Sequence, residues 1–196
     1  MIIRHHSARA GFQPRGQGFT LVETLIIVVI ASLLMMALFS LFEWHSSMYK
    51  YQQALVRVTG SARASLQAMD LYVRQAGAVL SSHDFNGTVY NSGPSVLVLQ
   101  LPSVDDNGDV LAGKSDYIVF YADGNRLMQR VQADASSARV SITKQLSDTL
   151  DSLTLTYDNV DPAQVKMVSA DIRTVQQVKG QVVRDRLSQN MYLKNH

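Results

Sequence analysis

The sequence predicts an α+β fold in which one long N-terminal helix precedes a mostly antiparallel β-sheet head. Three observations predict it: an apolar run fills residues 24–42, a helical spacing of apolar residues continues to about Leu80, and segments of strand character follow from Ser95. We expect the first half of the helix to span a membrane. Its amphipathic second half should pack on the sheet.

The apolar run from Thr24 to Phe42 has the length of a membrane span. Thr24, Ser32 and Ser40 are its polar residues, and each hydroxyl can bond back to its own helix. At about 1.5 Å per residue the run crosses roughly 30 Å of hydrocarbon, as a bilayer requires. A buried helix of a soluble core is less favoured by the length and flanks of the run.

The charges that flank the run predict its orientation. Residues 1–18 hold three arginines and no acid, whereas Glu43 and Trp44 open the other flank. The positive-inside rule therefore places the N-terminus in the cytoplasm and the rest of the chain outside. A cleaved secretory signal is less favoured, because the run exceeds the usual ~7–15 residues and no small-residue cleavage site follows Phe42.

A short motif joins the basic leader to the apolar run, and its residues are Gly18, Phe19, Thr20, Leu21, Val22 and Glu23. The motif resembles the processing site of type IV prepilins and the related pseudopilins. In that family a membrane-embedded aspartyl peptidase cuts after the glycine and N-methylates the new first residue. The resemblance implies a cut between Gly18 and Phe19 and methylation of Phe19. Many pilins also carry a helix-kinking proline midway along this segment, and the region around Ser40 has none.

Glu23 places a carboxylate at the start of the apolar run. A charge within a membrane costs about 2.5–3.5 kcal/mol on insertion scales, so it demands a partner. Cleavage exposes a cationic amine on Phe19, and Glu23 of an entering subunit can pair with that amine on a neighbour in a filament, where Coulomb attraction is poorly screened. The alternative is an interfacial carboxylate that reaches the lipid headgroups.

The resemblance implies a division of the chain into a leader that is removed (1–18), a transmembrane and filament-core helix (19–42), an amphipathic continuation (43–82) and a β-rich head (83–196). The implied partners are prepilin peptidase, other pilin or pseudopilin subunits, an inner-membrane assembly platform and the lipid bilayer. The implied location is the inner membrane, crossed once, and then a cell-envelope filament.

The size and the strand-rich tail are most similar to J-type minor pseudopilins or minor pilins. These resemblances imply a structural subunit that initiates, caps or tunes a type IV pilus or a type II secretion pseudopilus. The competing interpretation is a single-pass, membrane-anchored extracytoplasmic binding or sensor domain that is never cleaved.

Beyond the span, apolar residues recur at spacings of three and four, which indicates a helix with one apolar face. They are Tyr51, Leu55, Val58, Ala62, Leu66, Met69, Val73, Ala76 and Leu80. No proline occurs between Phe19 and Gly93, so a helix from Phe19 to about Leu80 would be roughly 90 Å long.

Turn-rich segments at residues 81–87 and 91–94 should end the helix. Seven later segments are strand-like, although the last could be partly helical: Ser95–Leu101, Asp116–Ala122, Arg126–Gln132, Ala138–Thr143, Leu153–Tyr157, Val165–Gln176 and Gln181–Lys194. Residues 122–125 predict a hairpin turn between the second and third of these strands.

Composition excludes several function classes. The net charge of +2 becomes −1 when the three leader arginines are removed, leaving 15 basic against 16 acidic residues. Five arginines could form a DNA-contacting patch, but no aromatic residues accompany them and no nucleic-acid partner is expected: Arg57, Arg63, Arg74, Arg126 and Arg130. The chain has no cysteine, so disulfides and thiol catalysis are impossible.

Metal binding and catalysis also have little support. The acidic segment from Asp105 to Asp109 lacks the glycine and glutamate of an EF-hand, because Val110 and Asp116 occupy those positions. A solvated hairpin turn is the favoured interpretation. Three histidines remain after processing, none at metal-site spacing, and no Gly-rich phosphate loop or serine elbow is present. We therefore expect no cofactor, no metal and no enzymatic activity.

Overall fold

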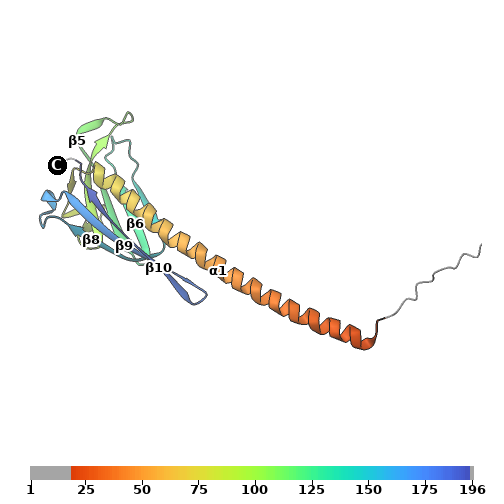
Figure 1. Cartoon of the computed structure of the whole chain (residues 1–196). Helices are drawn as coiled ribbons and strands as arrows, with labels where there is room; N and C mark the ends of the chain where they lie inside the picture. Colours follow the sequence, from red (N-terminus) through yellow and green to blue (C-terminus); the bar gives the residue numbers. More distant parts are fainter. Residues whose placement is uncertain (1–18, 195–196) are drawn as a thin grey trace, which may run out of the picture. The chain divides into compact units, whose positions relative to one another are not determined.

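The computed structural model describes residues 19–194, which form one long helix followed by ten strands (Figure 1). Helix α1 runs from Leu21 to Gln75. The chain divides between Ser46 and Ser47 into two compact units, which we describe separately. The first holds the apolar part of α1, and the second, called the head here, holds the rest of α1 and all the strands. The α+β architecture predicted from the sequence is confirmed.

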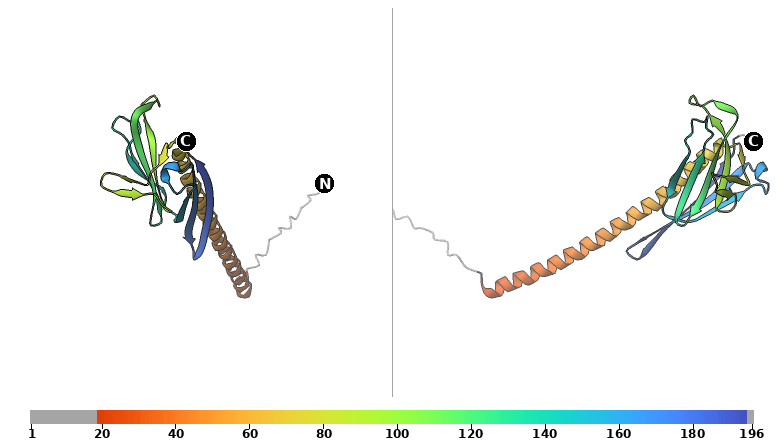
Figure 2. Two further views of the ribbon diagram at one scale, coloured as in Figure 1. Left: turned by 90° about the vertical axis from the view of Figure 1, so that its left-hand side faces the viewer. Right: turned by 180° about the vertical axis from the view of Figure 1, so that it is seen from behind.

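Two antiparallel sheets build the head, and the views in Figure 2 show them as separate blades. The five-stranded sheet has the order β1-β4-β5-β6-β7, the three-stranded sheet has the order β10-β9-β8, and β2 and β3 form a separate hairpin. The bounds are β1 Ala78–Val79, β2 Ser82–Asp84, β3 Val89–Asn91, β4 Val96–Val104, β5 Val110–Asp123, β6 Arg126–Gln132, β7 Ile142–Ser147, β8 Leu150–Tyr157, β9 Met167–Val178 and β10 Gln181–Tyr192. A short 3-10 helix covers Pro162–Gln164.

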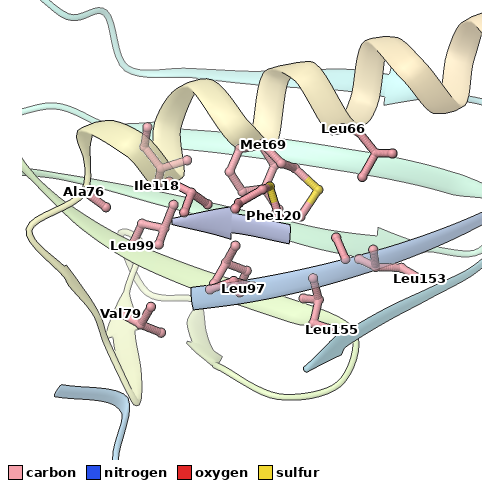
Figure 3. Close-up of a cluster of buried hydrophobic side chains, with 14 of the residues drawn as sticks. Leu66, Met69, Ala76, Val79, Leu97, Leu99, Ile118, Phe120, Leu153 and Leu155 are labelled. Carbon is pink, nitrogen blue, oxygen red and sulfur yellow. The ribbon is translucent and has the colours of Figure 1, made fainter. Parts of the chain in front are cut away.

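The predicted apolar face of α1 is largely confirmed and supplies one side of the core. Five of its residues and Ala76, which directly follows the helix, are at most 4% exposed; the five are Val58, Ala62, Leu66, Met69 and Val73. Figure 3 shows Leu66 and Met69 of α1 in one cluster with Phe120 of the five-stranded sheet and with Leu153 and Leu155 of β8. The cluster therefore joins the helix and both sheets into one apolar core.

The prediction is wrong for the first two residues of this face, Tyr51 and Leu55. Tyr51 is 37% exposed and Leu55 is 42% exposed, whereas Ala54 is 3% exposed. Ala54 packs with Val58 and with Val183 of β10 in a small second cluster. A residue with a small side chain lets the sheet approach the helix closely at this level, so the buried face passes through Ala54.

The predicted helix end at about Leu80 is also wrong, because α1 ends at Gln75. Gly77 donates its N–H to the carbonyl oxygen of Gln100 (2.9 Å), and Leu80 donates to Val98 (3.0 Å). Glycine weakens a helix, and the edge of β4 offers its backbone an alternative partner. The apolar residues after Gln75 therefore continue as strand β1.

The turn-rich segments that follow were predicted as loops, yet the first contains β2 and the second begins with the last residue of β3. Phe85, between these strands, is completely buried and packs with Val98 and Val119 on the face of the five-stranded sheet opposite α1. His83 stacks on the ring of Tyr117 at 3.7 Å. One buried aromatic side chain thus anchors a short hairpin whose other residues are mostly polar and typical of turns.

The seven predicted strands correspond to β4–β10, with one clear displacement. The segment predicted as a strand at 138–143 is mostly loop, and β7 begins at Ile142. The last segment is strand throughout, to Tyr192. The predicted hairpin turn is confirmed: Gly124 and Asn125 join β5 to β6, and Gly124 has a φ of +60°, which the first position of a type II′ turn requires.

A buried ionic network explains why the loop before β7 is ordered. The Asp116 side chain is fully buried, and its carboxylate accepts hydrogen bonds from Arg139 Nη1 (2.7 Å), Ser137 Oγ (2.7 Å), Ser103 Oγ (2.8 Å) and the Asp134 N–H (2.8 Å). Burial raises the pKa of the Asp116 carboxyl, but these four donors together lower it more, so the net pKa lies below its ordinary value.

Arg139 links this network to the end of the helix. Its Nη1 also donates to the carbonyl oxygen of Pro102 (2.6 Å), and its Nη2 donates to Oε1 of Gln75, the last residue of α1 (3.1 Å). The guanidinium group of Arg139 therefore connects β4, β5, the loop before β7 and the C-terminus of α1.

Candidate functional site

The candidate site is the start of α1, where Thr20 caps the helix. Thr20 Oγ1 accepts a hydrogen bond from the Glu23 N–H (3.2 Å), and the Thr20 carbonyl oxygen accepts from the N–H (3.0 Å) and the hydroxyl (3.2 Å) of Thr24. Thr20 is the N-cap and Glu23 is the third helical residue, which is the Thr-x-x-Glu arrangement of a capping box. This local role of Thr20 was missed from the sequence, although the spacing was a sufficient signal.

The cap by Thr20 fixes the start of α1 and so places Glu23 in the first turn of the helix. A negative charge in the first turn is stabilised by the positive end of the helix dipole. No ion pair found among residues 19–194 includes Glu23. The Phe19 side chain is 72% exposed. Gly18, the other residue of the predicted processing site, lies outside the described residues.

The apolar part of α1 presents an unprotected hydrophobic surface. Its large side chains from Leu21 to Phe42 are each at least 51% exposed. An 18-residue window of the helix has a mean hydropathy of 2.9 and contains no buried residue, so this helix is long and apolar enough to cross a membrane. Such a surface is stable in hydrocarbon or against other apolar helices, but not in water.

The three hydroxyls in this segment bond to their own helix, as predicted. Ser32 Oγ donates to the Val28 carbonyl oxygen at 2.7 Å and Ser40 Oγ donates to that of Met36 at 3.0 Å. Thr24 likewise donates its hydroxyl to the Thr20 carbonyl oxygen, so all three hydroxyls of the run are hydrogen-bonded to the backbone of their own segment.

The acidic segment forms the turn between β4 and β5, which confirms the interpretation as a hairpin turn. Asp105 Oδ1 accepts hydrogen bonds from the N–H groups of Asn107 and Asp109, both at 2.9 Å. The hydrogen bond from the Asp109 N–H is the main cause that lowers the pKa of the Asp105 carboxyl. No group of three or more potential metal ligands occurs among the described residues.

Most arginines of the candidate DNA patch are engaged within the head. Arg57 pairs with Asp148, Arg74 with Asp70 at 2.8 Å, and Arg126 with Asp123 at 2.8 Å, while Arg130 lies 6.0 Å from the centre of the Phe85 ring. These arginines belong to α1 and β6, and ion pairs partly neutralise the charges of Arg57, Arg74 and Arg126. These three charges are therefore less available to phosphate groups.

Comparison with known proteins agrees with the geometry at the start of α1. Residues 14–39 match the family model of the prokaryotic N-terminal methylation motif. No curated protein and no solved structure matches the chain. The matched segment contains Thr20, Glu23 and most of the exposed apolar helix. The match supports a type IV prepilin-like precursor with a membrane anchor, and the family that carries this motif consists of structural subunits.

Proposed function

We propose that this chain is a prepilin-type subunit that is cut between Gly18 and Phe19, methylated on Phe19 and held in the inner membrane until it enters a type IV-like filament. Its partners are then the prepilin peptidase, an assembly platform and other pilin or pseudopilin subunits. The observation that carries the proposal is Glu23, which lies at the capped start of a fully exposed apolar helix inside the matched motif.

In this proposal the charge of Glu23 drives the docking of one subunit onto another. The carboxylate is held in the first turn of α1 and lacks an ion-pair partner in the described part of the chain, while a cut before Phe19 creates a cationic amine four residues away. Pairing with the amine of a neighbouring subunit removes the cost of an unpaired charge in hydrocarbon. The ion pair therefore favours assembly over storage.

The test separates the charge of Glu23 from its place in the cap. Glu23→Gln removes the charge and keeps a polar side chain that suits the third helical position, whereas Glu23→Ala removes the polar group as well. The backbone N–H that bonds to Thr20 Oγ1 is present in both variants. Both variants should insert into membrane and lose the leader normally, and both should fail to enter filaments. Ser32→Ala, which removes only a bond within the helix, serves as the matched control. Normal incorporation of Glu23→Gln into filaments would overturn the docking role.

We propose further that the subunit is a minor one, which initiates, caps or tunes a pilus or a type II secretion pseudopilus. The support is the similarity of its size and strand-rich head to J-type minor pseudopilins. The orientation follows from the leader arginines, with the N-terminus in the cytoplasm and the head outside. A subunit present in many copies along the filament, measured by quantitative mass spectrometry of sheared filaments, would contradict the minor role.

The competing function is an uncleaved, membrane-anchored binding or sensor domain. Mass spectrometry of the N-terminus in native membranes separates the two. A first residue of N-methylated Phe19 supports the prepilin, whereas an intact Met1 supports the competitor. Gly18→Val, which changes the residue before the proposed cut, should leave the precursor unprocessed.

A further inference from the structure

The hairpin of β9 and β10 extends beyond the rest of its sheet as a two-stranded ribbon. The two strands pair without interruption from Met167–Tyr192 to Val178–Gln181. Strand β8 pairs with β9 only as far as Thr174. Val175 makes one further backbone bond on this side, from its N–H to the carbonyl oxygen of Thr149 (2.7 Å), and beyond it the ladder with β8 has ended. We call residues 175–184 the arm; Figure 1 shows it projecting beyond the sheets.

The arm is held against α1 within the head. A two-stranded hairpin is marginal in water by itself. Here Val178 and Val183 pack with Ala54 and Val58 of α1. At the tip, Lys179 and Gly180 have φ angles of +47° and +80°, the conformation of a type I′ turn, which keeps the two strands in register.

The tip of the arm lies beside the first residue of the head. Lys179 Nζ donates a hydrogen bond to Ser47 Oγ at 3.0 Å. Ser47 follows Phe42, the end of the apolar run, by five residues. Five residues rise about 7.5 Å in a helix and reach at most about 18 Å in any conformation. The headgroup regions add about 5–8 Å on each side of the hydrocarbon core. Chain length alone therefore keeps Ser47 and the arm tip close to the headgroups when residues 24–42 span the bilayer.

The residues around this position suit a lipid interface. Trp44 is 59% exposed and Tyr49 is 67% exposed, and these two residue types are enriched at membrane surfaces. Val182 on the arm is 44% exposed, and Lys50 is an exposed cation on the next turn of α1. Long lysine side chains extend readily to phosphate groups, although Glu43 adds one opposing charge to this region.

We infer that the arm tip rests on the phospholipid headgroup layer while the subunit is held in the membrane, so that the head has a second membrane contact besides its helix. This inference rests on the proposed membrane span. It does not require cleavage or filament assembly.

Site-specific fluorescence on the full chain tests the inference. The chain has no cysteine, so Gln181→Cys at the arm tip and Asn107→Cys in the β4–β5 turn each give one labelling site, and both native residues are exposed. The labelled chains are reconstituted into vesicles of phosphatidylethanolamine and phosphatidylglycerol that contain headgroup spin-labelled lipid. The label at position 181 should lose most of its fluorescence, and the label at 107 should keep it.

Trp44, the single tryptophan, reports membrane insertion independently. If Trp44 is quenched and neither label is, the arm inference is wrong while the membrane span stands. Equal quenching at 181 and 107 also overturns it, because the contact is then not specific to the arm. If the chain is washed from the vesicles at alkaline pH and Trp44 is unquenched, the span itself fails, and the proposed function fails with it.

Discussion

The stability of the head should depend strongly on Arg139, because this residue neutralises a carboxylate that has no access to water. The side chains of Asp116 and Arg139 are 0% and 17% exposed. Breaking a buried ion pair by removing one partner costs about 3–5 kcal/mol. Ser103, Ser137 and the Asp134 N–H still solvate the carboxylate, so we expect Arg139→Met to cost near the lower limit, about 3 kcal/mol.

A loss of this size is easily measured. It corresponds to a fall in Tm of about 6–12 °C for a chain of 150–250 residues, and circular dichroism of the full chain in detergent micelles follows the melting of the β-sheets. Arg126→Met is the matched control, because Arg126 pairs with Asp123 at the surface, where the side chains are 49% and 53% exposed. An exposed pair contributes less than about 1 kcal/mol.

Two results would refute the reasoning. Equal shifts in Tm for Arg139→Met and Arg126→Met would show that burial of the pair has no energetic consequence. A double variant, Asp116→Asn with Arg139→Met, should be less damaging than the sum of its single variants by about 1–3 kcal/mol, as expected of residues in direct contact. Simple additivity would show that the two side chains are not coupled.

Three further predictions concern the head. The pKa of Asp116 lies below its unfolded value of about 3.9, so its carboxylate stabilises the fold above about pH 4. This contribution is lost as the pH falls through the folded pKa. Between pH 6 and pH 2.5, the Tm of Asp116→Asn should therefore fall less steeply than the Tm of the unchanged chain. Burial raises the pKa of Tyr157 to about 12, so ultraviolet titration of Tyr157→Phe should lack one late-ionising tyrosine. The Tyr157 hydroxyl donates to the carbonyl oxygens of Gly93 (3.1 Å) and Val96 (3.0 Å), so the free energy of unfolding of the variant should drop by about 1 kcal/mol. Gly180→Ala should destabilise the arm by about 1–2 kcal/mol, seen as faster amide exchange at Val178 and Val183, because alanine disfavours a φ of +80°.

The elements that follow a regular period were predictable from the sequence. Val58, Leu66 and Met69 fall on one helical face, and burial of that face is what joins α1 to the sheets. The turn at Gly124 was predictable because two-residue hairpins require residues that tolerate positive φ. In both cases the physical requirement is local, so a short segment contains all the information.

The features that were missed depend on contacts between distant parts of the chain. The end of α1 was placed too late because the apolar pattern continues past Gln75, whereas the observed end is set by the carbonyl of Gln100. The pair of Asp116 and Arg139 has no sequence period, and its partners come together only after β4, β5 and the following loop are assembled. The cap by Thr20 is different, since its Thr-x-x-Glu signal was present in the candidate motif itself.

The arm should also open at a lower free energy than the main core of the head. Its apolar cluster contains only Ala54, Val58, Val183 and Val178, and is separate from the large core around Met69. Local opening requires only the contacts of the opening segment to be lost, so the arm can separate from α1 while the main core remains folded. Hydrogen exchange should therefore slow steadily along β9 from its tip toward Ile172. The arm and the neighbouring Ser47 should then rearrange at a lower free-energy cost than the main core.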